Sequence, residues 1–448
     1  MQINLSEEIK HLSLGDKRRD NRFIKIVNQK ISQPGHSIPE MGNSWSDIKM
    51  TYEFYYNEKI SETQIISCIQ NATVTRCLKN KMILNILDTT NISFSSSAEG
   101  LGYIDGAVGE GLMLHNSLAV DAQGCPLGLL SQKIWARDKS EMGKRKFRSS
   151  KDISEKESYR WIESIQQAEN LLKDIPLIIH IADRESDIYE LFIKPRSSNS
   201  ELLIRATHER KTLLGNNMWK EIEQESVLAS FELDIPKVVT EGVQKLSMQI
   251  KAGMVVLSPP AGKKHLPSLI VYGIIVREVN KKENGLEWRL ISTIPIKTAE
   301  EAIQCVQQYS YRWRIERFHY ILKSGCRLED LQLRNVNALR KAIIVYSFCA
   351  FKIMQMLYLS RIEPNQPCTN YFSETEWKIL SRIINKSPIV KNHPPTLKES
   401  VKMIAKLGGY LGRNSDGPPG IKNLWRGLQK LNTILQAINY KQEWLSTS

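Results

Sequence analysis

The residues of this 448-residue chain that could do chemistry are concentrated in the segment YSYRWRIERFHYILKSG, residues 309–325. If the segment is one helix turning about 100° per residue from Tyr309, then Arg312 lies near ~300° and Glu316 near ~340°. Lys323 lies near ~320°, so all four polar side chains share one narrow face. The apolar residues on the opposite side are Ile315, Phe318 and Leu322.

A carboxylate among cations is suited to binding a phosphodiester together with a divalent metal ion. Carboxylate oxygens bind hard cations, and arginine and lysine hold phosphate oxygens. Tyrosine can donate a hydrogen bond to the same phosphate. An ordinary surface helix would also pair Arg312 with Glu316, four residues later. The helix alone therefore leaves both interpretations open.

Two aspartates follow apolar segments of strand length. Asp88 ends KMILNILD, and Asp183 ends IPLIIHIAD, the most apolar strand-like segment of the chain. Ligand sites in open α/β sheets lie at the carboxyl ends of strands. Two such carboxylates and one from a helix can hold two metal ions about 3.5–4 Å apart, which suits phosphodiester displacement.

The elements that must position these acids change character along the chain. Residues 1–75 have helical spacing, with a Ser-x-x-Gln capping pattern at Ser61 and Gln64. From about residue 80, strand-like segments alternate with helices, which predicts a mixed α/β sheet. Residues 208–295 predict a β-rich insertion, and the pattern from about residue 298 to the end is helical.

Composition restricts the class of protein further. Lys and Arg number 62 against 48 Asp and Glu, a net charge of +14 that favours polyanionic partners. The seven cysteines form no C-x-x-C pair, so neither a zinc site nor a disulfide framework is expected. No secretory signal is expected at the N-terminus. The apolar segment 342–351 is too short to span a bilayer and predicts a buried helix.

Together these residues resemble the bacterial DDE transposases of the insertion-sequence-4 type, the group of the transposon-5 transposase. The signature of that family is Tyr-x2-Arg-x3-Glu-x6-Lys, which Tyr309, Arg312, Glu316 and Lys323 match in register. The three acids of the family correspond to Asp88 in LDTTNISF, Asp183 in ADRESDIYELF, and Glu316. SLGDKRRDNR resembles the start of the family's end-recognition domain, and VKMIAKLGGYLGR resembles its dimerisation region.

The resemblance implies an α/β fold with an RNase H-like catalytic core. It implies five parts, which are a DNA-end-binding domain (1–75), the first part of the core (76–207), the β-rich insertion (208–295), core helices carrying the catalytic Glu (296–360) and a dimerisation region (361–448).

The implied activity is cut-and-paste DNA transposition through a hairpin intermediate. Asp88, Asp183 and Glu316 would hold two Mg²⁺ ions, with Mn²⁺ as a substitute. Tyr309, Arg312 and Lys323 would position phosphates. The implied partners are double-stranded DNA, both terminal inverted repeats and target, and a second copy of the chain in a synaptic complex. No membrane partner is expected, and the expected location is the bacterial cytoplasm, at the nucleoid.

Other roles follow from the same resemblance. Trp288 and Trp313 correspond to tryptophans that handle a flipped base, although core packing is the common fate of tryptophan. The basic N-terminal residues expected to contact DNA are Lys17, Arg18, Arg19 and Arg22. His115 is interpreted as a packing residue, and His319 has no assigned role.

The chain departs from the family pattern in two places. No tryptophan precedes the Gly-Asp motif, and the segment NKSPIVKNHPPTLK replaces a densely basic one. Two alternatives remain, a non-catalytic DNA-binding regulator of transposition and an RNase H-like nuclease without strand transfer. The presence of the N-terminal segment and all three acids argues against the regulator.

Overall fold

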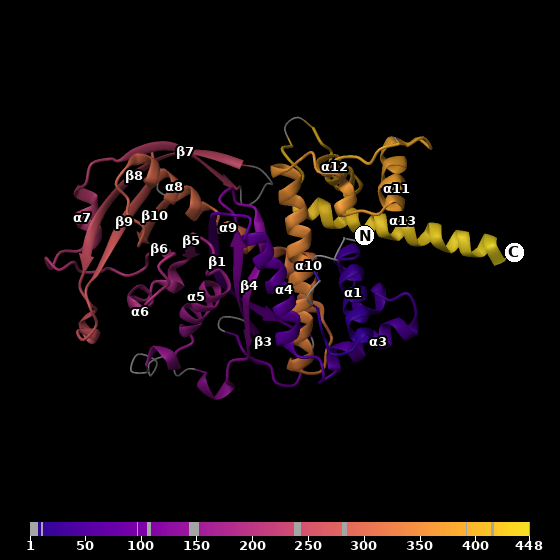
Figure 1. Ribbon diagram of the computed structural model, residues 1–448, viewed down its shortest axis with the longest axis horizontal. Coiled ribbons are helices and arrows are strands. Elements are labelled where there is room, and N and C mark those ends of the chain that lie inside the picture. The colour runs from indigo at the N-terminus through magenta and orange to yellow at the C-terminus, as the bar shows by residue number, and fades with distance from the viewer. Residues whose placement is uncertain are drawn as a thin grey trace.

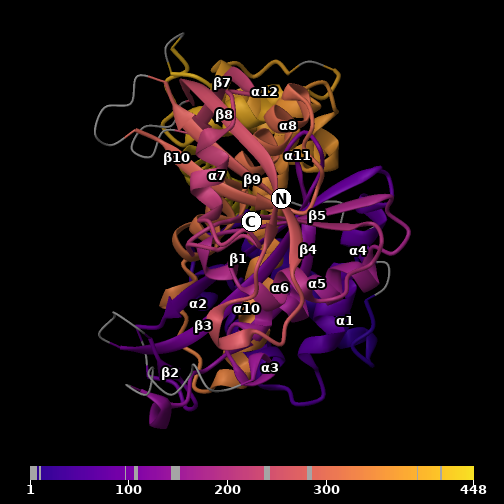
Figure 2. The same cartoon turned by 90° about the vertical axis from the view of Figure 1, so that its left-hand side faces the viewer.

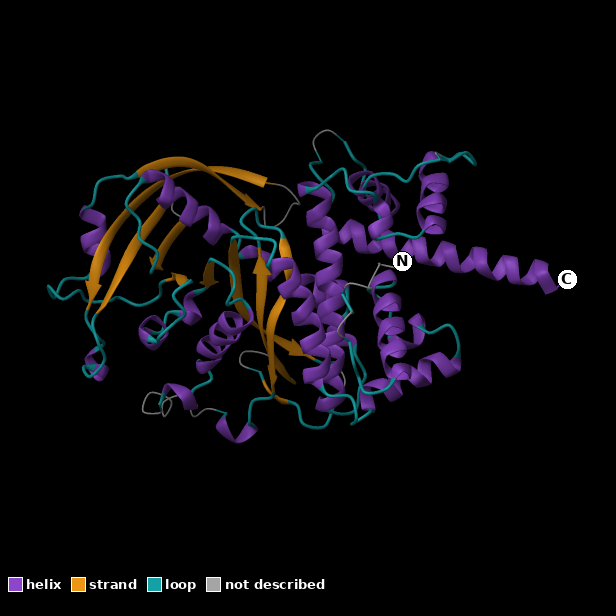
Figure 3. Cartoon of the chain, in the orientation of Figure 1, coloured by secondary structure: helices purple, strands orange, loops and turns teal. Residues whose placement is uncertain are grey.

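The computed structural model describes residues 8–9, 12–95, 97–104, 109–142, 152–236, 243–279, 285–390, 392–413 and 416–447. Its strands lie together in one half of the molecule, and most helices lie in the other half (Figure 3). The long helix α10 (Val336–Ile362) stands between the two halves (Figure 1). The predicted mixed α/β architecture with helical ends is confirmed.

The N-terminal region is helical, as its spacing predicts. Its helices are α1 (Lys17–Ser32), α2 (Ile38–Met41), α3 (Trp45–Tyr56) and α4 (Glu62–Cys77). The capping box predicted at Ser61 and Gln64 begins α4: each side chain bonds to the backbone N–H of the other residue. The start of this helix is therefore determined locally.

The half of the molecule that contains the strands is built on one mixed sheet. Its first six strands are β1 (Met82–Ser93), β2 (Gly102–Tyr103), β3 (Glu110–Val120), β4 (Pro126–Trp135), β5 (Leu177–Ala182) and β6 (Ser200–Arg205). The strand order is β2-β3-β1-β5-β6-β10-β9-β8-β7, with β4 beside β3. Strands β1, β5 and β6 run parallel, whereas β3 runs antiparallel to both β1 and β4.

The β-rich insertion extends this same sheet. Its strands are β7 (Ala229–Pro236), β8 (Val243–Leu257), β9 (Leu269–Glu278) and β10 (Glu287–Ser292), and its helix is α7 (Met218–Gln224). Strand β10 pairs antiparallel with β6, so the insertion and the core share one hydrogen-bonded ladder. The insertion lies at the end of the molecule away from α3 (Figures 1 and 2).

The core also contains two helices. Helix α5 (Tyr159–Leu171) comes after β4 in the chain, and helix α6 (Tyr189–Ile193) comes after β5. Short 3₁₀ turns lie at Lys139–Glu141, Ile153–Glu155, Arg184–Ser186, Ala261–Lys263, Leu328–Asp330 and Cys368–Asn370. The buried residues of β1 alternate between two faces. Ile83 packs in one cluster with Ala168 of α5, whereas Leu84 and Ile86 join the cluster of α9 and α10.

The segment 309–325 is not the single regular helix that the sequence predicted. It spans the end of α8 (Ala299–Ser310), α9 (Trp313–Tyr320) and a π-helical turn, η6 (Ile321–Gly325). At the break, the backbone N–H groups of Tyr311 and Arg312 each bond to the carbonyl three residues back, at 3.1 and 2.9 Å. One tight turn and one wide turn therefore replace regular helical geometry.

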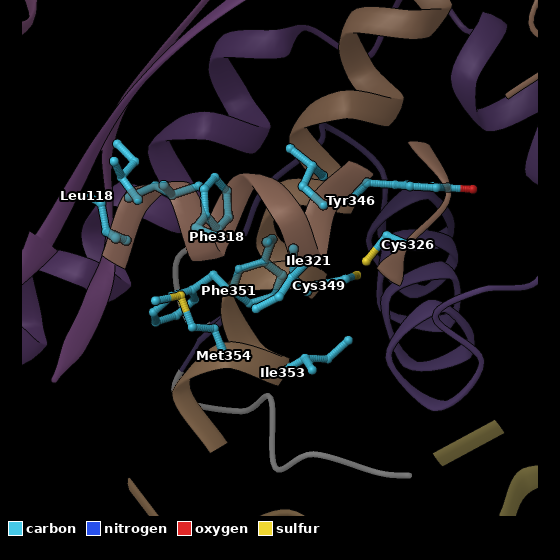
Figure 4. Close-up of a cluster of buried hydrophobic side chains, with 14 of the residues drawn as sticks. Leu118, Phe318, Ile321, Cys326, Tyr346, Cys349, Phe351, Ile353 and Met354 are labelled. Carbon is cyan, nitrogen blue, oxygen red and sulfur yellow. The ribbon is translucent and has the colours of Figure 1, made fainter. Parts of the chain in front are cut away.

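Packing against α10 determines which face α9 presents to the sheet. Phe318 and Ile321 lie among Phe351, Cys349 and their neighbours on α10 (Figure 4). All of these side chains are buried. The polar residues of α9 are thereby turned toward the strand edge.

The C-terminal region consists of α11 (Glu374–Asn385), α12 (Leu397–Leu407) and α13 (Ile421–Thr447), which projects from the body (Figure 1). Helices α12 and α13 approach at two glycines. A Cβ on Gly408 would lie 1.9 Å from the carbonyl oxygen of Asn423, and one on Gly427 would lie 1.9 Å from that of Ile404. Neither position can accept a larger residue without separating the two backbones.

Helix α10 is the one helix in the described ranges long and apolar enough to cross a membrane. Of its most apolar stretch, 94% is buried within the protein. This burial is that of a core helix, as predicted for residues 342–351. The seven cysteines are all buried and free.

Candidate active site

Asp88 and Asp183 lie side by side at one level of the sheet. Strands β1 and β5 are parallel, and Ile86 is paired with Ile181. Two residues further along each chain stand Asp88 and Asp183. The prediction that Asp88 ends its strand was wrong, because β1 continues to Ser93 by pairing with β3. Asp88 continues the face of β1 that carries Leu84 and Ile86, so it points toward α9.

The two aspartates interact electrostatically. The carboxylate of Asp183 accepts a hydrogen bond from the backbone N–H of Glu185 at 3.0 Å. Burial raises the pKa of Asp183, and the negative charge of Asp88 raises it further. Two carboxylates this close favour a cation between them.

Glu316 is held by Arg312, one helical turn before it. Arg312 donates to the Glu316 carboxylate at 2.6 Å, and the two side chains are 9% and 38% exposed. Burial alone would lower the pKa of Arg312, but Tyr309, Glu316 and Asp88 together raise it. The positive charge of Arg312 partly offsets the rise in the pKa of Asp183. The guanidinium therefore supplies positive charge to all three acids.

Tyr309 is buried next to Arg312 rather than exposed on an open helix face. Its side chain is 2% exposed, and its ring contacts Trp288 edge-on with centroids 5.1 Å apart. Its hydroxyl is buried without a hydrogen-bond partner in the described part of the chain. The helix breaks at Tyr311, but Tyr309 still lies close enough to Arg312 and Asp183 for their charges to act on its hydroxyl.

Lys323 is anchored at the edge of the sheet. Its ammonium group donates to the backbone carbonyl of Asn91 at 3.1 Å and lies 3.2 Å from the carboxylate of Glu329. Its side chain is 25% exposed. Lys323 thus lies beyond Asp88 along β1, where its charge is paired with Glu329.

The two tryptophans differ in accessibility. Trp288 is 2% exposed and is a core residue in the DNA-free protein. Trp313 is half-buried, and the guanidinium of Arg312 lies 5.3 Å from its ring centroid. A role for Trp288 in base handling would require its ring to leave the Tyr309 contact.

The four basic N-terminal residues do not form one free surface. Lys17 is exposed, and the Arg18 side chain is 91% exposed. Arg19 donates to the carbonyl of Leu14 at 3.0 Å. Arg22 is 15% exposed and pairs with the carboxylate of Asp47 at 2.5 Å. Arg22 therefore stabilises the packing of α1 on α3 in this structure.

Arg160 is a residue of the site that was not predicted from the sequence. Its guanidinium donates to the hydroxyl of Thr89 at 2.9 Å and to Glu185 at 2.7 Å. Thr89 follows Asp88, and Glu185 lies two residues after Asp183. The signal in the sequence is a cation, in EKESYRW, next to the buried apolar residues Trp161 and Ile162 of the same helix.

The three acids are chemically suited to bind divalent cations, provided that the Glu316 side chain moves. Asp88, Asp183 and Glu316 offer only oxygen ligands, which Mg²⁺ and Mn²⁺ accept. Burial raises the pKa of Asp183, the charge of Asp88 raises it further, and a bound cation would favour the ionised form of both acids. As they stand, no three His, Cys, Asp or Glu side chains of the described residues lie close enough to hold a metal ion. Glu316 would have to release Arg312.

Comparison with known families covers most of the chain. Residues 2–60 match a transposase DNA-binding domain, residues 162–351 a transposase DDE domain, and residues 348–448 the Tn5 transposase dimerisation domain. The DDE match contains Asp183 and Glu316, whereas Asp88 precedes it.

A solved structure of the piggyBac transposase synaptic complex with hairpin DNA is also similar. The similarity covers 94% of this chain and 73% of that one, at 8% sequence identity and a TM-score of 0.36. A likeness this low carries no argument about function. The evidence for function is the three consecutive family matches, which follow the order DNA binding, DDE domain and dimerisation. The chain belongs to the Tn5-like DDE transposases, enzymes that cleave DNA and transfer its strands.

Proposed function

We propose that this transposase moves an insertion sequence of the insertion-sequence-4 type by cut-and-paste transposition, with Asp88, Asp183 and Glu316 as its catalytic acids. DDE transposases use divalent metal ions, and we assign two Mg²⁺ ions, replaceable by Mn²⁺, to these acids. The observation that carries the proposal is the position of Asp88 and Asp183 on neighbouring parallel strands, where burial and then the charge of Asp88 raise the pKa of Asp183. When bound, two such ions activate an attacking oxygen and stabilise the leaving one.

The residues around the acids orient the DNA phosphate. Arg312 presents a planar fork of donors that matches a phosphate as well as a carboxylate. Arrival of the phosphate gives Arg312 a second anion, so that the Glu316 carboxylate is released toward Asp88 and Asp183. Lys323 places a point charge at the same edge of the sheet. Tyr309 lies beside Arg312 and contacts Trp288, and we assign it to the same phosphate-positioning set.

The reaction order is that of cut-and-paste transposition. Water attacks the phosphodiester at the end of the element and frees a 3′-hydroxyl. That hydroxyl attacks the opposite strand and gives a hairpin end. A second water opens the hairpin, and the 3′-hydroxyl then joins to target DNA. Each step displaces one oxygen of a phosphodiester by another, so one set of acids serves all of them.

The partners we assign are terminal inverted repeats, target DNA and a second copy of the chain in a synaptic complex. Support comes from the DNA-binding match at residues 2–60, the dimerisation match at 348–448 and the net charge of +14. We assign Trp313 to base handling together with Trp288, and Lys17 and Arg18 to contacts with DNA ends. The bacterial cytoplasm, at the nucleoid, is the location that follows.

The experiment uses DNA carrying the inverted repeats that flank the coding sequence. The full-length chain is incubated with this DNA and Mg²⁺ or Mn²⁺, beside Glu316→Gln as a matched variant. Denaturing gels resolve nicks, hairpins and joined products. Wild type should give all three, and the variant none. Joining without hairpins would overturn the hairpin step, and cleavage without joining would instead identify a nuclease. Binding without metal-dependent cleavage would identify a regulator.

A further inference from the structure

His319 connects the acidic site to a row of polar side chains on the sheet. It lies on α9, three residues after Glu316, and is 6% exposed. Its Nε2 atom lies 2.9 Å from Nδ2 of Asn116. Its Nδ1 atom lies 3.6 Å from Oδ2 of Asp88, an electrostatic contact slightly longer than a hydrogen bond.

The row crosses three neighbouring strands at one level. Asp88 of β1 is paired with Asn116 of β3, and Asn116 is paired with Gln132 of β4. Side chains paired in this way point to the same face of the sheet. The amide of Gln132 donates from Nε2 to Oδ1 of Asn116 at 2.8 Å. His319, on α9, thus lies over this face of the sheet and contacts both Asn116 and Asp88.

The direction of these hydrogen bonds determines where the imidazole carries its proton. Because Oδ1 of Asn116 accepts from Gln132, its Nδ2 faces His319 as a donor. Nε2 of His319 must then accept, and the ring proton lies on Nδ1. The ionised carboxylate of Asp88 requires the same direction, since it can only accept. Reversing the row would aim an imidazole lone pair at a carboxylate.

We propose that His319 is a positioning residue for Asp88. This role rests on the proposed function, in which Asp88 binds a metal ion. The row Gln132–Asn116–His319 holds an Nδ1–H dipole against Oδ2 of Asp88. This contact keeps Asp88 in one orientation and leaves its other oxygen, Oδ1, for a divalent cation. Second partners of metal-binding side chains orient them in this way.

The tautomer can be tested without metal, DNA or activity. Selective ¹⁵N labelling of the eight histidines, with His319→Asn to identify the His319 signals, reports which ring nitrogen is protonated in the metal-free chain. The expected result is a protonated Nδ1 and an unprotonated Nε2. A proton on Nε2 alone, or on both nitrogens, would overturn the inference.

A matched pair of variants separates positioning from packing. His319→Asn places an amide N–H where Nδ1 was and gives up the contact with Asn116, whereas His319→Gln reaches Asn116 and leaves nothing facing Asp88. Mn²⁺ binding to the full-length chain, measured by titration calorimetry, should weaken roughly 10–100-fold in His319→Gln. It should weaken much less in His319→Asn. Equal losses, or a larger loss in His319→Asn, would indicate packing alone and overturn the inference.

Two controls make the outcome specific. His180 is also buried between two side chains, Asn85 at 2.8 Å and Ser200 at 2.9 Å, and does not face the acids. His180→Gln should leave Mn²⁺ affinity unchanged, and an equal loss there would count against the inference. Asp88→Asn tests the proposed site itself. If Asp88→Asn kept full Mn²⁺ affinity, the assignment of the metal site would fail, while the tautomer result would stand separately.

Discussion

The guanidinium of Arg312 donates to the carboxylate of Glu316 across 2.6 Å, and Arg312 is the more buried partner. An ion pair between residues four apart on a helix contributes little when both are in water. Here Arg312 is only 9% exposed, and the negative charge of nearby Asp88 helps to raise its pKa. The pair therefore holds the Glu316 carboxylate beside Arg312, and no three acids of the described residues form a group that could hold a metal ion.

Replacing Arg312 should separate metal binding from catalysis. In Arg312→Ala the Glu316 carboxylate loses its competing cation, so Mn²⁺ affinity should be maintained or rise. DNA cleavage should fall by about 10²–10³-fold, the usual cost of one positioned transition-state donor. Calorimetry and single-turnover cleavage measure the two effects. Arg312→Lys, which keeps the charge without the fork, is the control, and lower Mn²⁺ affinity in Arg312→Ala would contradict this explanation.

Asp183 should make the metal-free protein less stable as the pH rises. Its pKa is above the ordinary value of 3.8, so the ionised form is disfavoured in the folded state. The destabilisation is absent well below pH 3.8 and complete once the pH has passed the raised pKa. Asp183→Asn keeps the hydrogen bond from Glu185, so only the charge is removed.

We therefore expect Asp183→Asn to melt at a higher temperature than wild type at pH 7 in the presence of EDTA. The difference should shrink as the pH falls toward 4. Mg²⁺ should raise the melting temperature of wild type and change that of the variant much less. Calorimetric scans over this pH range measure both effects. A variant less stable than wild type at pH 7 would show that Asp183 is not under electrostatic strain.

Arg18 and Arg22 should respond differently to substitution. Arg18→Ala removes an exposed cation, so DNA affinity should fall and the slope of log affinity against log salt should decrease by about 1. Its melting temperature should be unchanged. Arg22→Ala leaves the buried carboxylate of Asp47 with fewer partners, which should cost about 1–3 kcal/mol of stability. Fluorescence anisotropy and thermal melting distinguish the two, and equal stability losses would contradict the assignment.

Trp288 tests whether a buried tryptophan also handles DNA. Trp288→Ala should lose about 3–5 kcal/mol of stability, because it empties a core site beside Tyr309. Trp288→Phe keeps an aromatic ring and most of the fold, so it isolates the functional role. If the ring receives an extruded base, hairpin formation should fall in Trp288→Phe while the initial nick continues. Unchanged hairpin yield would restrict Trp288 to packing.

The sequence predicted those parts of the site that depend on local pattern. The apolar segments before Asp88 and Asp183 indicated strands, and parallel strands bring their carboxyl ends together. The relation between Arg312 and Glu316 depends only on helical spacing and was also foreseeable. The sequence could not predict that β1 continues past Asp88, because that extension depends on pairing with β3.

Tertiary contacts account for the other differences. Tyr309 is covered by a strand that lies some twenty residues before it in the sequence, and no helical wheel contains that neighbour. The π-helical turn at Ile321–Gly325 packs against α10, which follows it in the chain and is absent from any local helical pattern. Arg22 was predicted to contact DNA from its charge alone. Its partner Asp47 lies on another helix, so the local sequence does not show that the two residues pair.

The glycine contact between α12 and α13 has a mechanical consequence. From Gly427 to its end at Thr447, α13 extends for roughly 30 Å at 1.5 Å per residue. A tilt of about 5° at the crossing would move the far end by about 3 Å, comparable to the height of two residues in a helix. Backbone contact at Gly408 and Gly427 leaves little room for such a tilt. Because Gly408 and Gly427 have no side-chain carbon, their close contact determines the direction in which α13 projects.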